Sequence, residues 1–390
     1  MSQPQTGTTC VQSHKYKHPF NSHVFPVFLT STFSFDSVAH GSSLFNGEAE
    51  GHIYSRLANP TVQNTEHIIA ESEGGKFCLG FSSGMAAISA SLFANLKAGD
   101  EVVMSDCVYG CTVSLSRRFE QYGIKRTIVD MGDVENVKNA ITDATKIVYF
   151  ETPANPNLKV VDIEEVAKIA HENNCLCIVD NTFTTPIFCN PLSLGADIVV
   201  HSGTKYLNGH GDLIFGAAVM NDAEMFTHLM EFRVDFGALL SPSDAHLIAR
   251  GMRTLPLRMM EHYKNGLAVA HHLEAHPKVK KVWHPCLESH PGYAVHTKQS
   301  SGYGSTFSFE MECDESGAVR FVEAVKIFTN AVSLGCTDSL LCVPALTTHS
   351  GVPEEEKIAA GIHPGLVRLH VGLEHIDDII ADLDNALSQV

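Results

Sequence analysis

The stretch Val199-Val200-His201-Ser202-Gly203-Thr204-Lys205-Tyr206 decides the fold, because it places a lysine just beyond an apolar strand. An earlier apolar run, Cys175-Leu176-Cys177-Ile178-Val179, ends in Asp180-Asn181-Thr182. Apolar strands that alternate with helices predict a mostly parallel sheet covered on both faces. Ligands bind in such sheets where loops leave the carboxyl ends of the strands. We therefore expect Asp180 and Lys205 to lie close together at one edge of the sheet.

A carboxylate and a lysine at neighbouring strand ends are what pyridoxal phosphate requires. The lysine forms a Schiff base with the aldehyde, and the carboxylate pairs with the pyridinium nitrogen. The hydroxyls of Ser202 and Thr204, beside the lysine, suit the phosphate. The two segments predict an enzyme of amino-acid chemistry with this cofactor, in which Lys205 and Asp180 are catalytic.

The bulk composition is that of a globular protein with more than one domain. The chain has 390 residues, which exceeds the usual limit for a single core. Its formal net charge is −17, which argues against sequence-independent binding to nucleic acid or to anionic membranes. We expect a small-molecule substrate and neither of those partners.

The cysteines indicate a reducing compartment. There are eleven, an odd number at uneven spacing. The first twenty residues are polar, and no apolar stretch approaches the length of a membrane span. We expect a cytoplasmic protein with free thiols. The tight pair Cys175-x-Cys177, with His171 nearby, leaves a metal site as a minor alternative, but the pattern is that of a buried strand and we expect no metal.

Three regions follow from the pattern along the chain. Residues 1–59 contain few periodic runs and are predicted to form an extended arm without its own core. Residues 60–251 alternate strand and helix and form the predicted cofactor-binding domain. A helix is expected over 161–173, and strands over 101–104, 146–150, 175–179, 198–201 and 213–220.

Residues 252–390 are predicted to form a smaller α+β domain. Its expected elements are a long helix over 255–276, strands over 304–312 and 366–371, and helices over 318–328 and 377–387.

Two further segments carry candidate site residues. Ser82-Ser83-Gly84-Met85-Ala86-Ala87 resembles a helix start, which suits a phosphate or is an ordinary serine N-cap. Tyr109-Gly110-Cys111-Thr112 opens another helix. Tyr109 could stack on a cofactor ring and exchange a proton with a leaving group, or it could be a packing residue. Cys111 is either a reactive thiol or a small buried hydrophobe.

Two arginines complete the candidates. Tyr54-Ser55-Arg56 lies in the arm, and an arginine fork recognises phosphate bidentately. A role across a subunit boundary is attractive there, with a surface arginine as the alternative. Arg368 sits within an apolar strand, where a charge needs a partner. A substrate carboxylate or an internal acid would serve.

Taken together, these segments resemble the pyridoxal-phosphate enzymes of cysteine and methionine metabolism, the transsulfuration group. The resemblance covers nearly the whole chain, and it rests on Tyr54 to Thr61, Ser83-Gly84-Met85, Tyr109 to Thr112, Glu151-Thr152-Pro153-Ala154-Asn155-Pro156, Val179 to Phe183, Ser202 to His210 and Val332-Ser333-Leu334-Gly335.

The resemblance implies an α/β fold of the aspartate-aminotransferase (type I) kind and a homotetramer of two active-site dimers. It implies that Lys205 binds the cofactor aldehyde, that Asp180 binds the ring nitrogen and that Tyr109 stacks on the ring. The implied phosphate ligands are Gly84, Met85, Ser202, Thr204 and, from the neighbouring subunit, Tyr54 and Arg56. The implied ligands of the substrate carboxylate are Arg368, Ser333 and Asn155.

Within the family, Cys111 favours the enzymes that eliminate methanethiol from methionine, because many relatives have glycine there. Ile53 and Cys342 point the same way, because cystathionine γ-lyases tend to carry glutamates at the corresponding places. Two positions depart from this pattern: Val234, where a lysine is usual, and Thr347, where a methionine is usual. The expected reaction is α,γ-elimination of methionine, with Lys205 as base and Tyr109 as acid.

Three alternatives stay open. The nearest is cystathionine γ-lyase or homocysteine or cysteine desulfuration within the same family. A nucleotide-dependent oxidoreductase is disfavoured, since no Gly-x-Gly-x-x-Gly follows a strand. The third is a non-catalytic binding protein that retains the fold.

Overall fold

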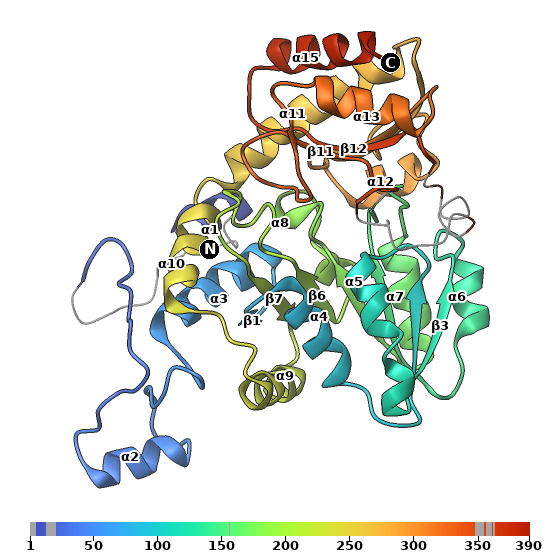
Figure 1. The fold of residues 1–390 in the computed structure, drawn as a ribbon. Helices are drawn as coiled ribbons and strands as arrows, with labels where there is room; N and C mark the ends of the chain where they lie inside the picture. Colours follow the sequence, from blue (N-terminus) through green and yellow to red (C-terminus); the bar gives the residue numbers. More distant parts are fainter. Residues whose placement is uncertain (1–4, 13–20, 156, 348–354, 356–360, 362) are drawn as a thin grey trace.

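The computed structural model describes residues 5–12, 21–155, 157–347, 355, 361 and 363–390. Within these residues, the strands form two sheets that are flanked by helices (Figure 1). No helix in the described part of the chain is long and apolar enough to cross a membrane.

The larger sheet has seven strands in the order β1-β7-β6-β5-β4-β2-β3. The strands are β1 (Phe77–Phe81), β2 (Glu101–Ser105), β3 (Lys125–Val129), β4 (Thr145–Glu151), β5 (Leu176–Asp180), β6 (Ile198–His201) and β7 (Gly216–Met220). Neighbouring strands run parallel except where β7 pairs with β1 and β6. The predicted mostly parallel sheet is therefore confirmed.

Two strands of this sheet were absent from the sequence prediction. The edge strand β3 leaves Lys125 and Ile128 exposed, so it lacks the apolar run that marks a buried strand. The other edge strand, β1, is short and contains Gly80. The five predicted strands correspond to β2, β4, β5, β6 and β7.

Helices pack in two layers, one on each face of this sheet. Apolar residues of α4 and α9 join one core cluster with alternate strand residues, and those of α3, α6, α7, α8 and α10 join the other. The helices are α3 (Pro60–Glu73), α4 (Gly84–Phe93), α5 (Gly110–Ser116), α6 (Val134–Ala140), α7 (Ile163–Glu172), α8 (Thr185–Phe188), α9 (Ala223–Phe236) and α10 (Pro242–Met252).

The smaller sheet has the order β10-β11-β12-β9-β8 and is mostly antiparallel. Its strands and the helices beside it are β8 (Val279–Trp283), β9 (Thr306–Met311), β10 (Thr329–Asn330), β11 (Leu340–Cys342), β12 (Leu366–His370), α11 (Leu255–Glu274), α12 (Tyr293–Gln299), α13 (Glu315–Ala324) and α15 (Ile376–Ser388). One apolar cluster runs from the larger sheet into this one, so the two halves share a core.

Helix α13 begins and ends earlier than the predicted helix over 318–328. Its N-cap Asp314 accepts a hydrogen bond from Gly317 N at 2.9 Å, which starts the helix at Glu315. The Asp382 carboxylate then accepts the N–H groups of Lys326 and Ile327. Because a distant side chain captures these donors, the helix ends at Ala324.

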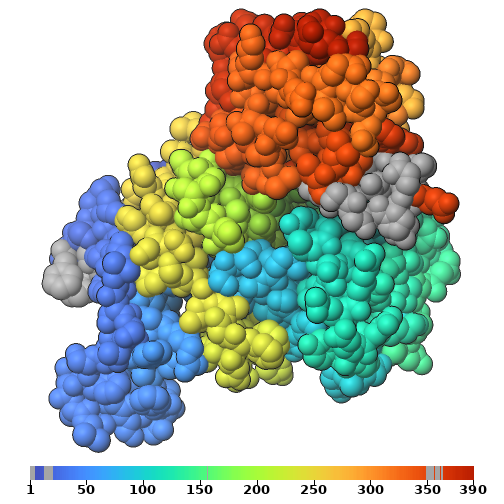
Figure 2. Space-filling model, in the orientation of Figure 1, coloured from blue at the N-terminus to red at the C-terminus, as the bar shows by residue number. Residues whose placement is uncertain are grey.

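Among the described residues before Pro60, the structure shows two short helices. Helix α1 (Thr6–Gln12) packs against α3, and its Cys10 is 1% exposed. Helix α2 (Val38–Phe45) projects away from the two sheets, as Figures 1 and 2 show. Val38 is 92% exposed and Phe45 67% exposed, so α2 presents apolar side chains to its surroundings.

Candidate active site

A cavity of about 330 Å³ lies at the carboxyl ends of β4, β5 and β6 and is closed by residues from the smaller domain. Its volume is within the range of small-molecule and cofactor sites. Of the residues expected at the site, it is lined by Gly84, Met85, Tyr109, Asn155, Asp180, Ser202, Thr204, Lys205, Ser333 and Arg368. The sheet therefore brings together segments that are far apart in the sequence.

The loop after β6 sets the position of Lys205. A Cβ on Gly203 would lie 1.8 Å from the Phe215 ring, so only glycine allows this close turn. Lys205 N donates to Ser202 O at 3.1 Å, and Lys205 Nζ donates to Ser333 Oγ at 3.0 Å. Burial and then the charge of Arg368 lower the pKa of Lys205 to about 8. The amine is therefore readily deprotonated for a lysine.

Asp180 ends the neighbouring strand β5, where it pairs in register with Val200. Its Oδ1 accepts hydrogen bonds from the N–H and the hydroxyl of Thr182, at 2.9 and 2.5 Å. The Thr182 hydroxyl also accepts from Ser202 N at 2.8 Å. Burial raises the pKa of Asp180, and the two bonds from Thr182 oppose that rise. A buried carboxylate in such a place favours a cationic partner.

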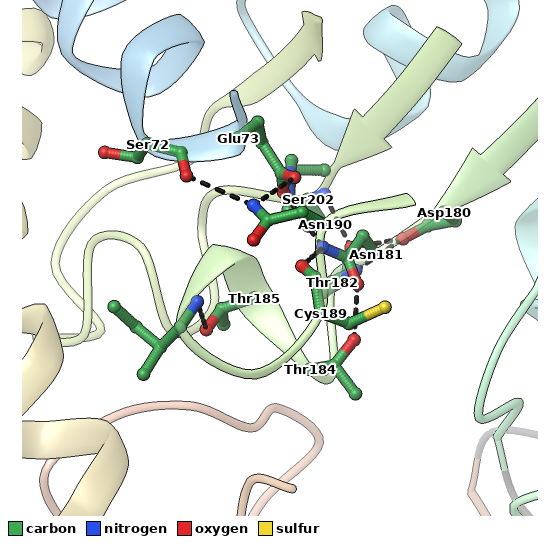
Figure 3. Close-up of polar contacts among 12 residues, drawn as sticks. Ser72, Glu73, Asp180, Asn181, Thr182, Thr184, Thr185, Cys189, Asn190 and Ser202 are labelled. Carbon is green, nitrogen blue, oxygen red and sulfur yellow. Dashed lines mark hydrogen bonds and ion pairs between the residues drawn. The ribbon is translucent and has the colours of Figure 1, made fainter. Parts of the chain in front are cut away.

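A buried polar network lies beneath these strand ends and was not predicted from the sequence (Figure 3). Glu73, at the end of α3, accepts from Asn181 Nδ2 at 2.9 Å and lies 2.5 Å from His201 Nε2. Asn190 Nδ2 donates to Ser72 O at 3.2 Å. Because Asn181 and His201 each adjoin a cavity residue, this network anchors both Asp180 and Ser202.

The start of α4 fits a phosphate group. Ser83 caps the helix by accepting from Ala86 N at 3.1 Å. A Cβ on Gly84 would lie 2.7 Å from Ser202 Cβ, so the glycine lets the helix end approach the loop after β6. The first N–H groups of a helix have no acceptor within it, and the helix dipole favours an anion there. Unlike those free N–H groups, the Thr204 hydroxyl already has backbone partners, because it donates to Phe215 O and accepts from Phe215 N.

Tyr109 precedes α5 and is held by a residue that sequence reasoning missed. Its N–H donates to Glu151 Oε1 at 2.6 Å. The hydrogen bond with the Cys111 thiol and then burial raise the pKa of Tyr109 to about 12. Burial and the nearby Asp180 charge also raise the pKa of Glu151 well above its ordinary value. Glu151 ends β4 as Asp180 ends β5, and that shared position is the signal that could have identified it.

Arg368 reaches the cavity from β12 of the smaller sheet. Nη1 donates to Asn155 Oδ1 and Nη2 to Ser333 O, each at 3.3 Å. The side chain is buried, and its partners among the described residues are neutral. The guanidinium can therefore receive an anionic ligand.

Three expected site residues do not line the cavity of their own chain. Arg56 Nη1 donates to Val234 O at 3.2 Å, and its guanidinium lies 5.9 Å from the centroid of the Tyr54 ring. Cys111 is exposed in the first turn of α5. It contacts the site only through the Tyr109 hydroxyl.

The structure also revises which apolar residues face the cavity. Cys342 is fully buried in β11, where it pairs with Arg368, and it does not line the cavity. The apolar side chains that do line it include Ile88, Phe183, Ile214, Val332 and Leu334, to which the sequence analysis assigned no role in the site. The described residues hold no group of three or more potential metal ligands, and Cys175 Sγ donates to Thr145 O.

Taken together, the residues present fit pyridoxal phosphate. A lysine amine, a buried carboxylate, an aromatic ring and an anion-binding helix start meet in one cavity. These are the groups that bind the aldehyde, the ring nitrogen, the ring face and the phosphate of that cofactor.

Comparisons with known proteins agree with this chemistry. Residues 7–388 match the family described as Cys/Met metabolism PLP-dependent enzyme. An L-methionine gamma-lyase of Fusobacterium nucleatum is 46% identical and is covered over 100% of both chains. A cystathionine beta-lyase of Lactococcus lactis is 42% identical over 93% of each chain. The crystal structure of cystathionine gamma-lyase from Lactobacillus plantarum, complexed with L-serine, superposes with a TM-score of 0.93 at 34% identity and covers 99% of each chain.

Proposed function

Since the chain belongs to the Cys/Met metabolism PLP-dependent enzyme family, we propose that it is a carbon–sulfur lyase that acts on L-methionine. The reaction is an α,γ-elimination that converts methionine and water into methanethiol, 2-oxobutanoate and ammonia. Its cofactor is pyridoxal 5′-phosphate.

The observation that carries this proposal is the apolar part of the cavity wall. Ile214, Val332 and Leu334 line the same cavity as Lys205. A methyl thioether suits such a wall, whereas the distal ammonium of cystathionine would need an anionic partner there. The two acids in the cavity are already engaged: Glu151 accepts from Tyr109 N, and Asp180 accepts from Thr182.

Arg368 orients the substrate. Its guanidinium has neutral partners, Asn155 and Ser333, and a substrate carboxylate would give it a charged one. Bidentate binding of the carboxylate fixes the direction in which the Cα–H bond points, and the Ser333 hydroxyl, which lines the same cavity, would share in this contact.

Lys205 moves the protons at carbon. When bound, pyridoxal phosphate supplies an electron-withdrawing ring that accepts the electron pair left at Cα. Because burial and Arg368 lower the pKa of Lys205 to about 8, a useful fraction of the amine is neutral near that pH. The neutral Nζ takes the proton from Cα, gives that proton up to the electron-accepting group and, neutral again, takes one from Cβ, as γ-elimination requires.

Tyr109 supplies the proton for the leaving group. With a pKa of about 12, its hydroxyl stays protonated at neutral pH. It can therefore donate that proton to the departing thiolate sulfur. Gly84 and Met85 N–H groups and the Ser202 hydroxyl would hold the phosphate, and Asp180 would hold the ring nitrogen. The Thr204 hydroxyl would join them by exchanging its bond to Phe215 O for one to the phosphate.

The quaternary structure proposed is a homotetramer of two dimers with shared active sites. Tyr54 and Arg56 lie outside the cavity of their own chain, in the part that carries the projecting helix α2. In a dimer, these side chains would complete the phosphate site of the neighbouring subunit.

We also propose that the chain is divided into an arm over 1–59, a cofactor-binding domain over 60–251 and a smaller domain over 252–390. The location that we propose is the cytoplasm, which the eleven free cysteines support.

Gas-phase detection of methanethiol tests the proposal. Purified holoenzyme should release methanethiol and 2-oxobutanoate from methionine in equal amounts, and Lys205→Ala should release neither. The second candidate is cleavage of cystathionine, which the 42% identical cystathionine beta-lyase favours. Release of a thiol amino acid from cystathionine without methanethiol from methionine would replace the proposal by that candidate.

A further inference from the structure

His370 and Arg368 lie on the same face of β12, since alternate residues of a strand share a face. Arg368 Nη2 donates to Ser333 O, as described above. His370 lies two residues further on, with Nε2 at 2.8 Å from Cys336 O and 3.1 Å from Gly335 N. The two side chains therefore hold both ends of loop 333–336, which has no strand or helix of its own.

The contacts of His370 assign its protons. Cys336 O can only accept, so the ring donates to it through Nε2. Nδ1 is then an acceptor, with the Thr306 hydroxyl at 3.1 Å and Gly335 N at 3.3 Å. Burial, His262 and the charges of Arg368 and Lys205 lower the pKa of His370, so the ring is neutral. The neutral ring therefore donates to the loop at Cys336 O, and Gly335 N lies close to both ring nitrogens, 3.1 Å from Nε2 and 3.3 Å from Nδ1.

The loop that His370 holds lies directly against the catalytic lysine. Gly335 has φ +79°, and a Cβ there would lie 2.5 Å from Tyr206 N and 2.7 Å from Lys205 C. The Ser333 hydroxyl accepts from Lys205 Nζ at 3.0 Å. A shift of this loop would therefore move Ser333 relative to both Lys205 and Arg368.

The packing of the ring leaves little freedom for such a shift. His370 is 1% exposed and lies edge-on to Tyr206, with centroids 5.7 Å apart. His262 completes the cluster, with its ring centroid 5.1 Å from that of His370 and 5.3 Å from that of Tyr206. The hydrogen bonds of His262 go to Val371 O and to the Ser305 hydroxyl, which also lies 3.3 Å from His370 Nδ1, and none of them reaches a described residue of loop 333–336.

From this geometry we propose that His370 is a positioning residue that fixes loop 333–336 and so sets the site for the substrate carboxylate. It touches neither cofactor nor substrate; it acts through the backbone of Gly335 and Cys336 on Ser333. This proposal rests on the proposed function only in that a substrate carboxylate binds at Arg368 and Ser333.

Two ligands of the holoenzyme separate positioning from general damage. Glycine carries the carboxylate, whereas 3-(methylthio)propylamine is methionine without it. Both are measured by the change in cofactor absorbance. For His370→Leu we expect about tenfold weaker binding of glycine, the effect of one to two lost hydrogen bonds. Binding of 3-(methylthio)propylamine should change by less than about twofold.

Matched variants make the test specific. His370→Gln can still reach Cys336 O and should bind glycine within about threefold of wild type, whereas the shorter His370→Asn should resemble the leucine variant. His262→Leu disturbs the same buried cluster but removes only the bonds to Val371 O and the Ser305 hydroxyl, and it should leave the glycine affinity unchanged.

The proposal would be overturned if His370→Leu bound both ligands more weakly by the same factor. It would also be overturned if His262→Leu bound glycine more weakly while its affinity for 3-(methylthio)propylamine was unchanged. If His370→Leu fails to retain cofactor, the comparison of the glutamine and asparagine variants decides, and equal glycine affinities would count against it. Both readouts measure binding, and neither requires the release of a thiol. A wild-type enzyme that produces no methanethiol would thus refute the methionine reaction and leave this test unaffected.

Discussion

Glu151 on β4 pairs in direct register with Asp180 on β5, so that two buried acids end neighbouring strands at the cavity. Two close carboxylates do not both ionise readily in a buried site. Asp180 is stabilised by two hydrogen bonds from Thr182. Burial and the Asp180 charge raise the pKa of Glu151 well above its ordinary value. Glu151 is therefore the member of the pair that keeps the proton.

Glu151→Gln should retain cofactor and fold, because glutamine replaces a neutral acid and can still accept from Tyr109 N. Glu151→Ala removes that acceptor and should lower the free energy of unfolding by about 1–3 kcal/mol. A raised pKa in the folded state stabilises the protein at low pH, and this contribution is lost as pH rises through the folded-state value. Melting temperatures should therefore fall more steeply with rising pH in wild type than in Glu151→Gln. Parallel curves would show that Glu151 is ionised.

The turnover number should depend on the protonation of Lys205. The neutral amine is the base, and the pKa of about 8 means that kcat falls about tenfold for each pH unit below that value. Arg368→Gln removes a charge that lowers this pKa, so the acidic limb of kcat should move to higher pH. Measuring kcat against pH at saturating methionine gives the acidic limb for the wild type and for Arg368→Gln. An unchanged limb in Arg368→Gln would assign it to another group.

Gly84→Ala should abolish cofactor binding at ordinary concentrations. The new Cβ would lie 2.7 Å from Ser202 Cβ, where both the helix start and the lysine loop would have to move. Gly74→Ala is the matched control, because Gly74 has φ +71° and nothing within 4 Å of a Cβ. It should cost about 1 kcal/mol of stability from backbone strain while binding cofactor normally. Titration of the apoenzymes with pyridoxal phosphate distinguishes the two.

Val332→Glu should shift substrate preference toward cystathionine. Val332 is 58% exposed and lines the cavity, so a carboxylate there can meet the distal ammonium of that substrate. We expect kcat/KM for methionine to fall about tenfold or more, as the apolar contact is replaced by a charge. Val332→Gln, of equal size and without charge, should lose methionine activity and gain nothing on cystathionine. If Val332→Gln gained activity on cystathionine, the charge of the glutamate could not be the cause of the shift in preference.

Mixed assemblies should reveal shared active sites. Lys205→Ala and Arg56→Ala are each expected to be inactive or nearly so. If Arg56 serves the neighbouring subunit, coexpression of the two variants creates dimers with one intact site, and about a quarter of all sites are restored. If Arg56 serves its own chain, every site carries one defect, and the mixture stays as inactive as its parents.

The strand ends show how much of the site the sequence could predict. Lys205 and Asp180 each follow a buried apolar run, and a parallel sheet brings such ends to one edge. Glu151 follows the same kind of run and belongs to a quoted motif, but no role was predicted for it, since nothing in its segment separates a buried acid from a surface one. The register of β4 against β5 makes that distinction.

Local sequence also does not reveal contacts between distant segments of the smaller domain. Asp382 ends α13 through the N–H groups of Lys326 and Ile327, a bond across more than fifty positions of chain. In the sequence, His370 is one more polar residue in an alternating strand. Its contacts with loop 333–336 become visible only in the folded structure.

What the sequence by itself determined is the chemistry: a lysine and an aspartate after apolar strands, a glycine at a helix start and an arginine inside a strand. Such features are local, since each depends on the hydrophobic period of one segment and on the residue at its end. Only the tertiary structure decided which side chains share the cavity, which acid keeps its proton and which residue positions the loop at Lys205. These properties depend on burial and on distances between segments, and neither is fixed until the chain is packed.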